Sequence, residues 1–111
     1  MASENVDWAD AAADVYTYFN ERSRTFDVKR MLSVVDDCAL AGRISQTTLV
    51  EKFKSKDFIA TVLGHVTTAI HGKGVVPTGG WYFASGSPPL YTIDEGFAGA
   101  WKAKRRLSQT P

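Results

Sequence analysis

The feature that most constrains the fold of this chain is an amphipathic segment between residues 57 and 71. Asp57 can cap a helix, and Gly72 and Gly74 follow where a helix would end. Between these limits the apolar residues recur at three- and four-residue intervals, the period of one helix face: Phe58, Ile59, Val62, Leu63, Val66, Ala69 and Ile70. We therefore predict a helix over 57–71 that buries one face and leaves the other in solvent.

Weaker signals of the same kind place the other elements. Residues 43–46 can form a short strand, and β-favouring residues predict a hairpin with strands 81–83 and 90–93. The sequence Thr92-Ile93-Asp94-Glu95 fits a capping box, so we expect Thr92 to cap a final helix. Capping residues and helical spacing predict four helices besides the long one, over residues 7–22, 27–42, 47–54 and 93–107.

Length and composition indicate one domain over residues 1–111, with a frayed tail at 108–111. A chain of 111 residues that is 44% hydrophobic can bury one core, and a lone Cys38 excludes an intramolecular disulfide. No apolar run approaches the ~20 residues of a membrane helix, so we expect no membrane association. The first residues are acidic and lack the features of a signal peptide, which leads us to expect a cytoplasmic protein.

The sequence offers no recognisable catalytic, metal or cofactor site. His65 and His71 lie six residues apart and would point away from each other on one helix. Asp36 and Asp37 beside Cys38 would raise the pKa of its thiol, which is the opposite of what a nucleophile needs. No glycine-rich segment continues into the Gly-Lys-Ser or Gly-Lys-Thr of a phosphate-binding loop. We therefore expect a protein that is not an enzyme and that carries neither metal nor cofactor.

The order of elements resembles the winged helix-turn-helix arrangement. Two helices joined at Ser55-Lys56-Asp57 follow a helix and precede a hairpin, and the resemblance covers residues 27–107. The stretch Leu90-Tyr91-Thr92-Ile93-Asp94-Glu95-Gly96 looks like the way many winged-helix domains pass from the wing to a closing helix. The resemblance implies a mainly α fold with a small β-hairpin, to which 7–22 adds an extra N-terminal helix. It also implies that 47–54 is the positioning helix and 57–71 the recognition helix.

The leading functional prediction is DNA binding by a small dimeric transcriptional regulator. Residues 1–42 carry eight acids against four basic residues (net −4), and residues 43–111 carry nine basic residues against four acids (net +5). A polyanion would therefore meet the second half. Helix 57–71 would enter the major groove of double-stranded DNA, and lysines near its start with the basic patch 102–106 would hold phosphates. The residues assigned to this interface are Thr47, Lys52, Lys54, Lys56, Thr61, Gly64, His65, Thr68, Lys73, Lys102, Arg105 and Arg106.

An alternative is a protein-interaction module on the same scaffold. The predicted hairpin carries no basic residue, and the face of helix 57–71 has no Arg, Asn or Gln for a bidentate base contact. Alternation would send Trp81 and Phe83 to one face of the hairpin and Tyr82 to the other. A protein partner could dock on this aromatic hairpin or on the acidic first helix, as expected for a small inhibitory protein of a mobile element. A homodimer could form through residues 7–22 or 93–107, although 7–22 could equally complete the core of one monomer.

Overall fold

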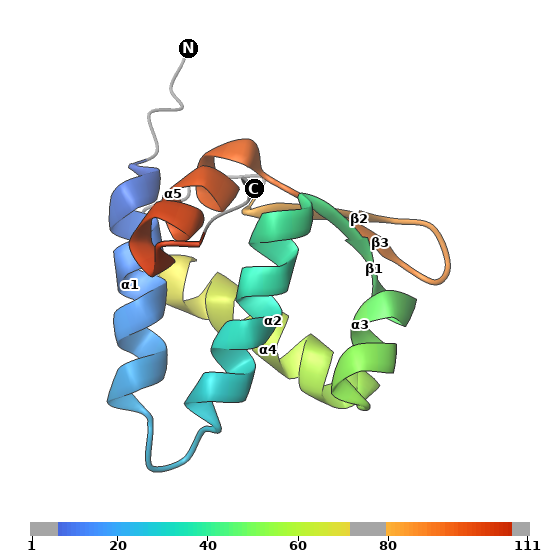
Figure 1. The fold of residues 1–111 in the computed structure, drawn as a ribbon, viewed down its shortest axis with the longest axis horizontal. Helices are drawn as coiled ribbons and strands as arrows, with labels where there is room; N and C mark the ends of the chain where they lie inside the picture. Colours follow the sequence, from blue (N-terminus) through green and yellow to red (C-terminus); the bar gives the residue numbers. More distant parts are fainter. Residues whose placement is uncertain (1–6, 72–79, 108–111) are drawn as a thin grey trace.

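The computed structural model describes residues 7–71 and 80–107 of the chain (Figure 1). These residues are mainly helical, with a small antiparallel sheet of three strands, which confirms the predicted balance of helix and strand. The elements in chain order are α1 (Trp8–Glu21), α2 (Val28–Ala41), β1 (Arg43–Ser45), α3 (Gln46–Phe53), α4 (Lys56–His71), β2 (Tyr82–Ser85), β3 (Leu90–Ile93) and α5 (Glu95–Arg105).

The cap of the long helix lies two residues earlier than the sequence indicates. Asp57 was the expected cap, but it lies inside α4, and the Ser55 hydroxyl accepts the backbone N–H of Phe58 at 3.0 Å. The reason is that α3 ends at Lys54, which adopts a left-handed conformation (φ 68°) and turns the chain within two residues. Ser55 is then the first side chain placed to satisfy an orphan donor of α4.

The cap of the last helix is also displaced from its expected position. Thr92 belongs to β3, where it pairs with Arg43 on one side and Phe83 on the other. Because Thr92 is held in the ladder, the helix begins only after Asp94, whose carboxylate accepts the N–H of Gly96 at 2.7 Å.

The sheet has the strand order β1-β3-β2, so the predicted hairpin gains β1 as a third strand. The expectation that Trp81 and Phe83 share a face is wrong. Trp81 precedes β2 and is 1% exposed, with its indole N–H donating to the Thr67 hydroxyl at 3.0 Å, whereas Phe83 is 66% exposed. Strand alternation begins only at Tyr82, so it does not extend back to Trp81.

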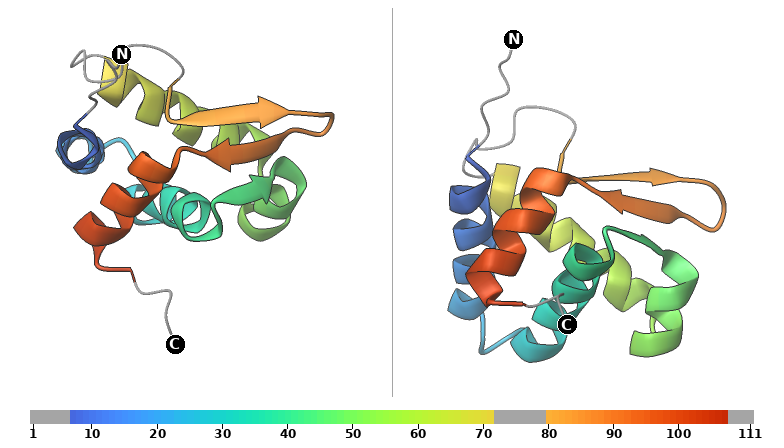
Figure 2. Two further views of the ribbon diagram at one scale, coloured as in Figure 1. Left: turned by 90° about the horizontal axis from the view of Figure 1, so that it is seen from above. Right: turned by 45° about the horizontal axis from the view of Figure 1, so that its top comes forward.

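All five helices contribute to one buried cluster. The apolar face of α4 is buried as its spacing predicts, with Ile59, Val62 and Val66 fully enclosed. Helix α1 packs against α5 and α4 and buries Val15 and Phe19, so residues 7–22 complete the core of the monomer. Figure 2 shows α4 and α5 on opposite sides of the molecule. Within the described ranges no helix has the length and apolar character that crossing a membrane requires.

Candidate nucleic-acid interface

The exposed face of α4 is a row of small side chains that begins with a lysine. Lys56, Ala60, Gly64 and Thr68 are spaced four residues apart and are all exposed, and Thr61 is exposed beside them. Apart from the neighbouring backbone of α4 itself, no described atom lies within 4 Å of the position that a Cβ on Gly64 would occupy. A groove or surface of a partner could therefore approach the α4 backbone closely along this row.

His65 does not belong to this exposed face, although the sequence assigned it there. Its ring packs 4.7 Å from the Phe26 ring, and its Nδ1 lies 2.9 Å from the Tyr18 hydroxyl. Partial burial, with a smaller contribution from the charge of Arg22, lowers the pKa of His65 below its ordinary value. His65 therefore joins α4 to α1. Its partners are separated from it by 39 and 47 positions, so helical spacing alone could not place them.

The turn between α3 and α4 carries two exposed lysines at the start of the exposed row. Lys54 ends α3 in its left-handed conformation, and Lys56 is the first residue of α4. Lys52, one turn back on α3, donates to the Asp37 carboxylate at 2.7 Å but keeps 60% of its side chain exposed. Thr47 is exposed at the other end of α3. Lys52, Lys54 and Lys56 thus lie on the last turn of α3, at its C-cap and at the first residue of α4.

The turn is held in place by an arginine that the sequence analysis did not single out. Arg30 on α2 donates a hydrogen bond to the backbone carbonyl of Phe53, and its guanidinium lies 4.2 Å from the centre of the Phe58 ring. This one side chain therefore contacts the last turn of α3 and the first turn of α4. No local pattern marks such a residue, because its partners are 23 and 28 positions away.

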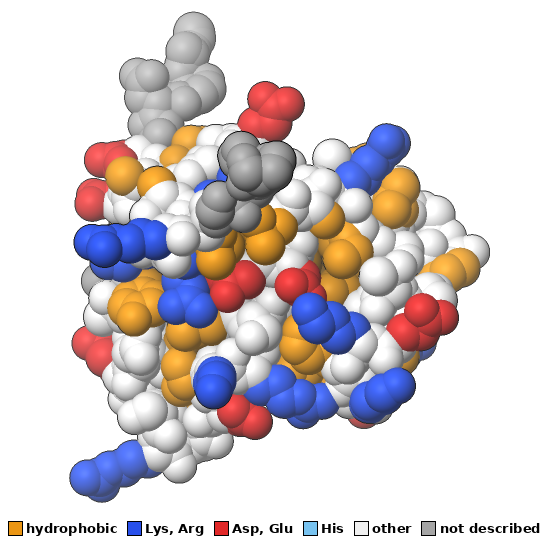
Figure 3. All heavy atoms as spheres, in the orientation of Figure 1, with side chains coloured by type: hydrophobic (Ala, Val, Ile, Leu, Met, Phe, Trp, Pro, Cys, Tyr) orange, Lys and Arg blue, Asp and Glu red, His pale blue; other side chains and the backbone are white. Residues whose placement is uncertain are grey.

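The C-terminal basic patch does not join this site. Arg105 makes two hydrogen bonds of 3.0 Å to the Asp36 carboxylate, and Lys104 lies over the Tyr16 ring at 5.1 Å. Lys102 is half-buried, and Arg106 is exposed just beyond α5. They belong to α5 and the residue that follows it, and the left view of Figure 2 shows α5 on the opposite side of the molecule from α4. On the face that carries α5, basic and acidic side chains are interspersed, with hydrophobic ones between them (Figure 3). Lys73 lies outside the described residues.

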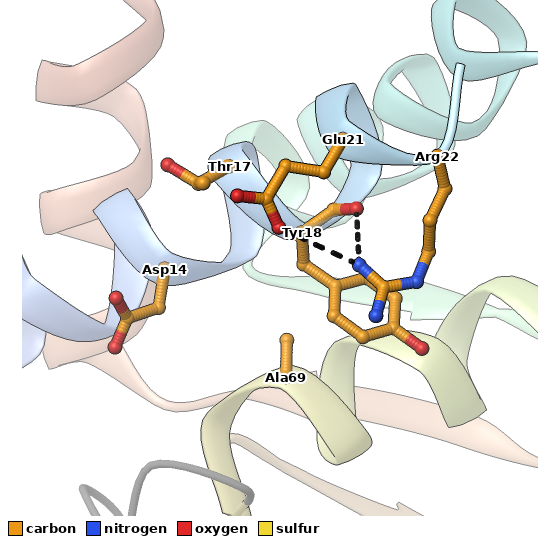
Figure 4. A pocket seen from close by; sticks show the side chains of 6 residues that line it. All are labelled: Asp14, Thr17, Tyr18, Glu21, Arg22 and Ala69. Atoms are coloured by element: carbon orange, nitrogen blue, oxygen red, sulfur yellow. Dashed lines mark hydrogen bonds and ion pairs between the residues drawn. The ribbon is translucent and has the colours of Figure 1, made fainter. Parts of the chain in front are cut away.

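A hollow of about 160 Å³ lies where α1 meets α4 (Figure 4). Arg22 spans it, with its guanidinium 3.7 Å from the centre of the Tyr18 ring and 3.8 Å from the Glu21 carboxylate. Ala69 closes the side toward α4, and Asp14 and Thr17 complete the lining. Glu21 and the Tyr18 ring therefore both contact the one cation of this lining.

Cys38 and the possible metal ligands are the remaining candidates for chemistry in the described residues. Cys38 is fully buried, and burial together with Asp37 raises the pKa of its thiol to about 12, which leaves it in the unreactive protonated form. Among the residues that the structure describes, no three His, Cys, Asp or Glu side chains lie close enough to hold a metal ion. No protein family, curated protein or solved structure matches the chain.

Proposed function

We propose that this protein binds double-stranded DNA through the exposed face of α4, as a winged helix-turn-helix domain. The observation that carries the proposal is the exposed row Lys56, Ala60, Gly64 and Thr68, in which one lysine is followed by three small residues. The arrangement around it supports the proposal: α2 precedes the helix pair α3–α4, and the hairpin β2–β3 follows. In this proposal Lys54 and Lys56 contact phosphates, and Thr61 and Thr68 face the groove.

The chemistry of the face favours binding that depends more on phosphates than on base sequence. Threonine can donate to a phosphate or contact a thymine methyl, but neither contact discriminates strongly between bases. Each lysine–phosphate contact releases a counterion and steepens the dependence of affinity on salt. His65 and the patch 102–106 have no part in the proposed interface, because α1 covers the first and the second lies on another side.

The test measures fluorescence anisotropy of a labelled 20-base-pair duplex at low salt. The variant K54E/K56E should bind the duplex at least tenfold more weakly. The slope of its log affinity against log salt concentration should become shallower by the amount expected for the loss of about two phosphate contacts. The matched control is K104E/R106E, which changes the net charge equally with two exposed residues at the end of α5 and should stay within about threefold of the wild type. Absence of duplex binding by the wild type, or equal loss in both variants, would overturn the proposal.

A second function is favoured by one observation, the exposure of Phe83 on a hairpin without charged residues. An aromatic, uncharged surface suits a protein partner better than a phosphate backbone. If the hairpin docks a protein, F83S removes that docking and leaves the duplex affinity of the protein unchanged.

A further inference from the structure

The two edges of the sheet differ in how they are protected against pairing with another strand. At one edge β1 has only three residues, carries the exposed Arg43 and leads directly into α3. At the other edge β2 reads Tyr-Phe-Ala-Ser, with neither a charge nor a proline. Natural edge strands are usually blunted by charge, proline, bulges or short length. The β2 edge has none of the first three, and Figure 2 shows it as the outer strand of a hairpin that extends beyond the helices.

The register identifies which backbone groups of β2 face outward. The N–H of Ile93 donates to the Gly42 carbonyl on the β1 side at 2.8 Å, and the N–H of Asp94 donates to the Trp81 carbonyl at 2.8 Å, so residue 93 bonds toward β1 and residue 94 toward β2. Backbone direction alternates along an antiparallel strand, so Phe83 and Ser85 also bond to β3, opposite Thr92 and Leu90. The N–H and C=O of Tyr82 and Ala84 therefore point away from β3, one on each side of Phe83.

We propose that a second copy of this chain pairs with β2, antiparallel, about a two-fold axis at Phe83. Tyr82 of each copy then exchanges both backbone hydrogen bonds with Ala84 of the other copy. Phe83 faces its own counterpart in a non-hydrogen-bonded pair, in which opposing side chains approach most closely. The pairing covers Phe83, the most exposed large hydrophobic residue of the described chain, and joins two three-stranded sheets into one of six strands.

The charge pattern favours a second copy as the occupant of this edge. A two-fold axis brings identical residues together, so a charge on the strand would meet the same charge. The described hairpin residues from Trp81 to Ile93 include no Asp, Glu, Lys or Arg, so they meet no such repulsion. This inference concerns β2 alone and does not depend on the proposal for α4.

Disulfide cross-linking tests the register directly. In the proposed dimer the two Phe83 Cα atoms lie about 4.5 Å apart, so F83C should form a covalent dimer during air oxidation. S85C is the matched control, because its two copies would be four residues apart along the strands, roughly 13 Å, beyond the reach of a disulfide. Cys38 is fully buried and leaves this readout undisturbed. The proposal expects at least a tenfold faster cross-link for F83C than for S85C on a non-reducing gel.

Sedimentation velocity over a range of protein concentrations provides the second arm. The wild type should pass from monomer to dimer, and A84P should stay monomeric. At concentrations where the wild type is monomeric, A84P should show the same urea unfolding curve, because proline removes an outward N–H that β3 does not use. A wild type that remains monomeric at all concentrations, or F83C and S85C cross-linking equally fast, would overturn the pairing. Neither arm contains DNA, so failure here is distinct from failure of the duplex-binding proposal.

Discussion

At the residue scale, the two neighbouring carboxylates of α2 have different roles. Asp36, 15% exposed, accepts the Trp101 indole N–H at 2.7 Å and binds the Arg105 guanidinium through two bonds. Asp37, 23% exposed, pairs with Lys52, which is largely in solvent. Asp36 therefore fastens α5 to α2, while Asp37 makes a surface ion pair of the kind that contributes little to stability.

Replacing each carboxylate by alanine should separate these roles. D36A leaves a guanidinium and a buried indole N–H without their acceptor, and we expect the free energy of unfolding to fall by about 2 kcal/mol or more. D37A should lower it by less than about 1 kcal/mol. Urea unfolding followed by tryptophan fluorescence measures both, and equal losses would show that Asp36 does not fasten α5.

His65 makes the stability of the fold depend on pH. Its pKa is lowered in the folded protein, so the folded state binds fewer protons at this site than the unfolded chain. The contribution of His65 to the stability of the folded state is therefore complete above its ordinary pKa of 6.5 and is lost as the pH falls below that value. Thermal unfolding midpoints between pH 5 and pH 7.5 should fall more steeply with acid for the wild type than for H65Q.

An NMR titration identifies the physical cause. Burial is the larger cause of the lowered pKa of His65 and the charge of Arg22 is the smaller one, so R22Q should raise that pKa part of the way toward the ordinary value. A wild-type imidazole that titrates at or above 6.5, or one that R22Q leaves unmoved, would contradict this assignment.

At the element scale, two glycines of α5 show how closely α1 is docked. A Cβ on Gly96 would collide with the Trp8 indole of α1, whereas no atom lies within 4 Å of the equivalent position on Gly99. G96A should therefore destabilise the protein by about 1–3 kcal/mol through overpacking. G99A should stabilise it by about 0.5–1 kcal/mol, because alanine is the better helix former. Urea midpoints that shift in the same direction for both variants would show that α1 does not seat on α5 in this way.

The helices were predictable from local patterns, but the first turns of α4 and α5 were not. Spacing alone located the buried face of α4 because Ile59, Val62 and Val66 repeat with the helical period. The predicted caps were wrong where a neighbouring element fixes the chain. Thr92 is hydrogen-bonded within β3, and the left-handed conformation of Lys54 places Ser55, and not Asp57, at the start of α4. Competition of this kind is decided by tertiary structure.

At the scale of the whole molecule, the fold divides the basic residues that the sequence had grouped. Arg105 binds Asp36, which is 69 positions away in the sequence. The basic residues next to Arg105 therefore lie with α5, on a different side of the molecule from α4. The lysines near the α3–α4 turn were predictable as a group because they are close in sequence. The exclusion of His65 and of the patch 102–106 was not, since it depends on where α1 and α5 pack. The candidate interface is accordingly smaller than the sequence suggested.

We propose the exposed row on α4 as the surface that meets duplex DNA. The most direct measurement is an NMR titration of the ¹⁵N-labelled protein with an unlabelled 20-base-pair duplex at low salt. We expect the largest amide shifts at Ala60, Thr61, Gly64 and Thr68, and further shifts at Lys54 and Lys56. Shifts concentrated on α5, or amides of the row that stay unmoved at saturating duplex, would contradict it.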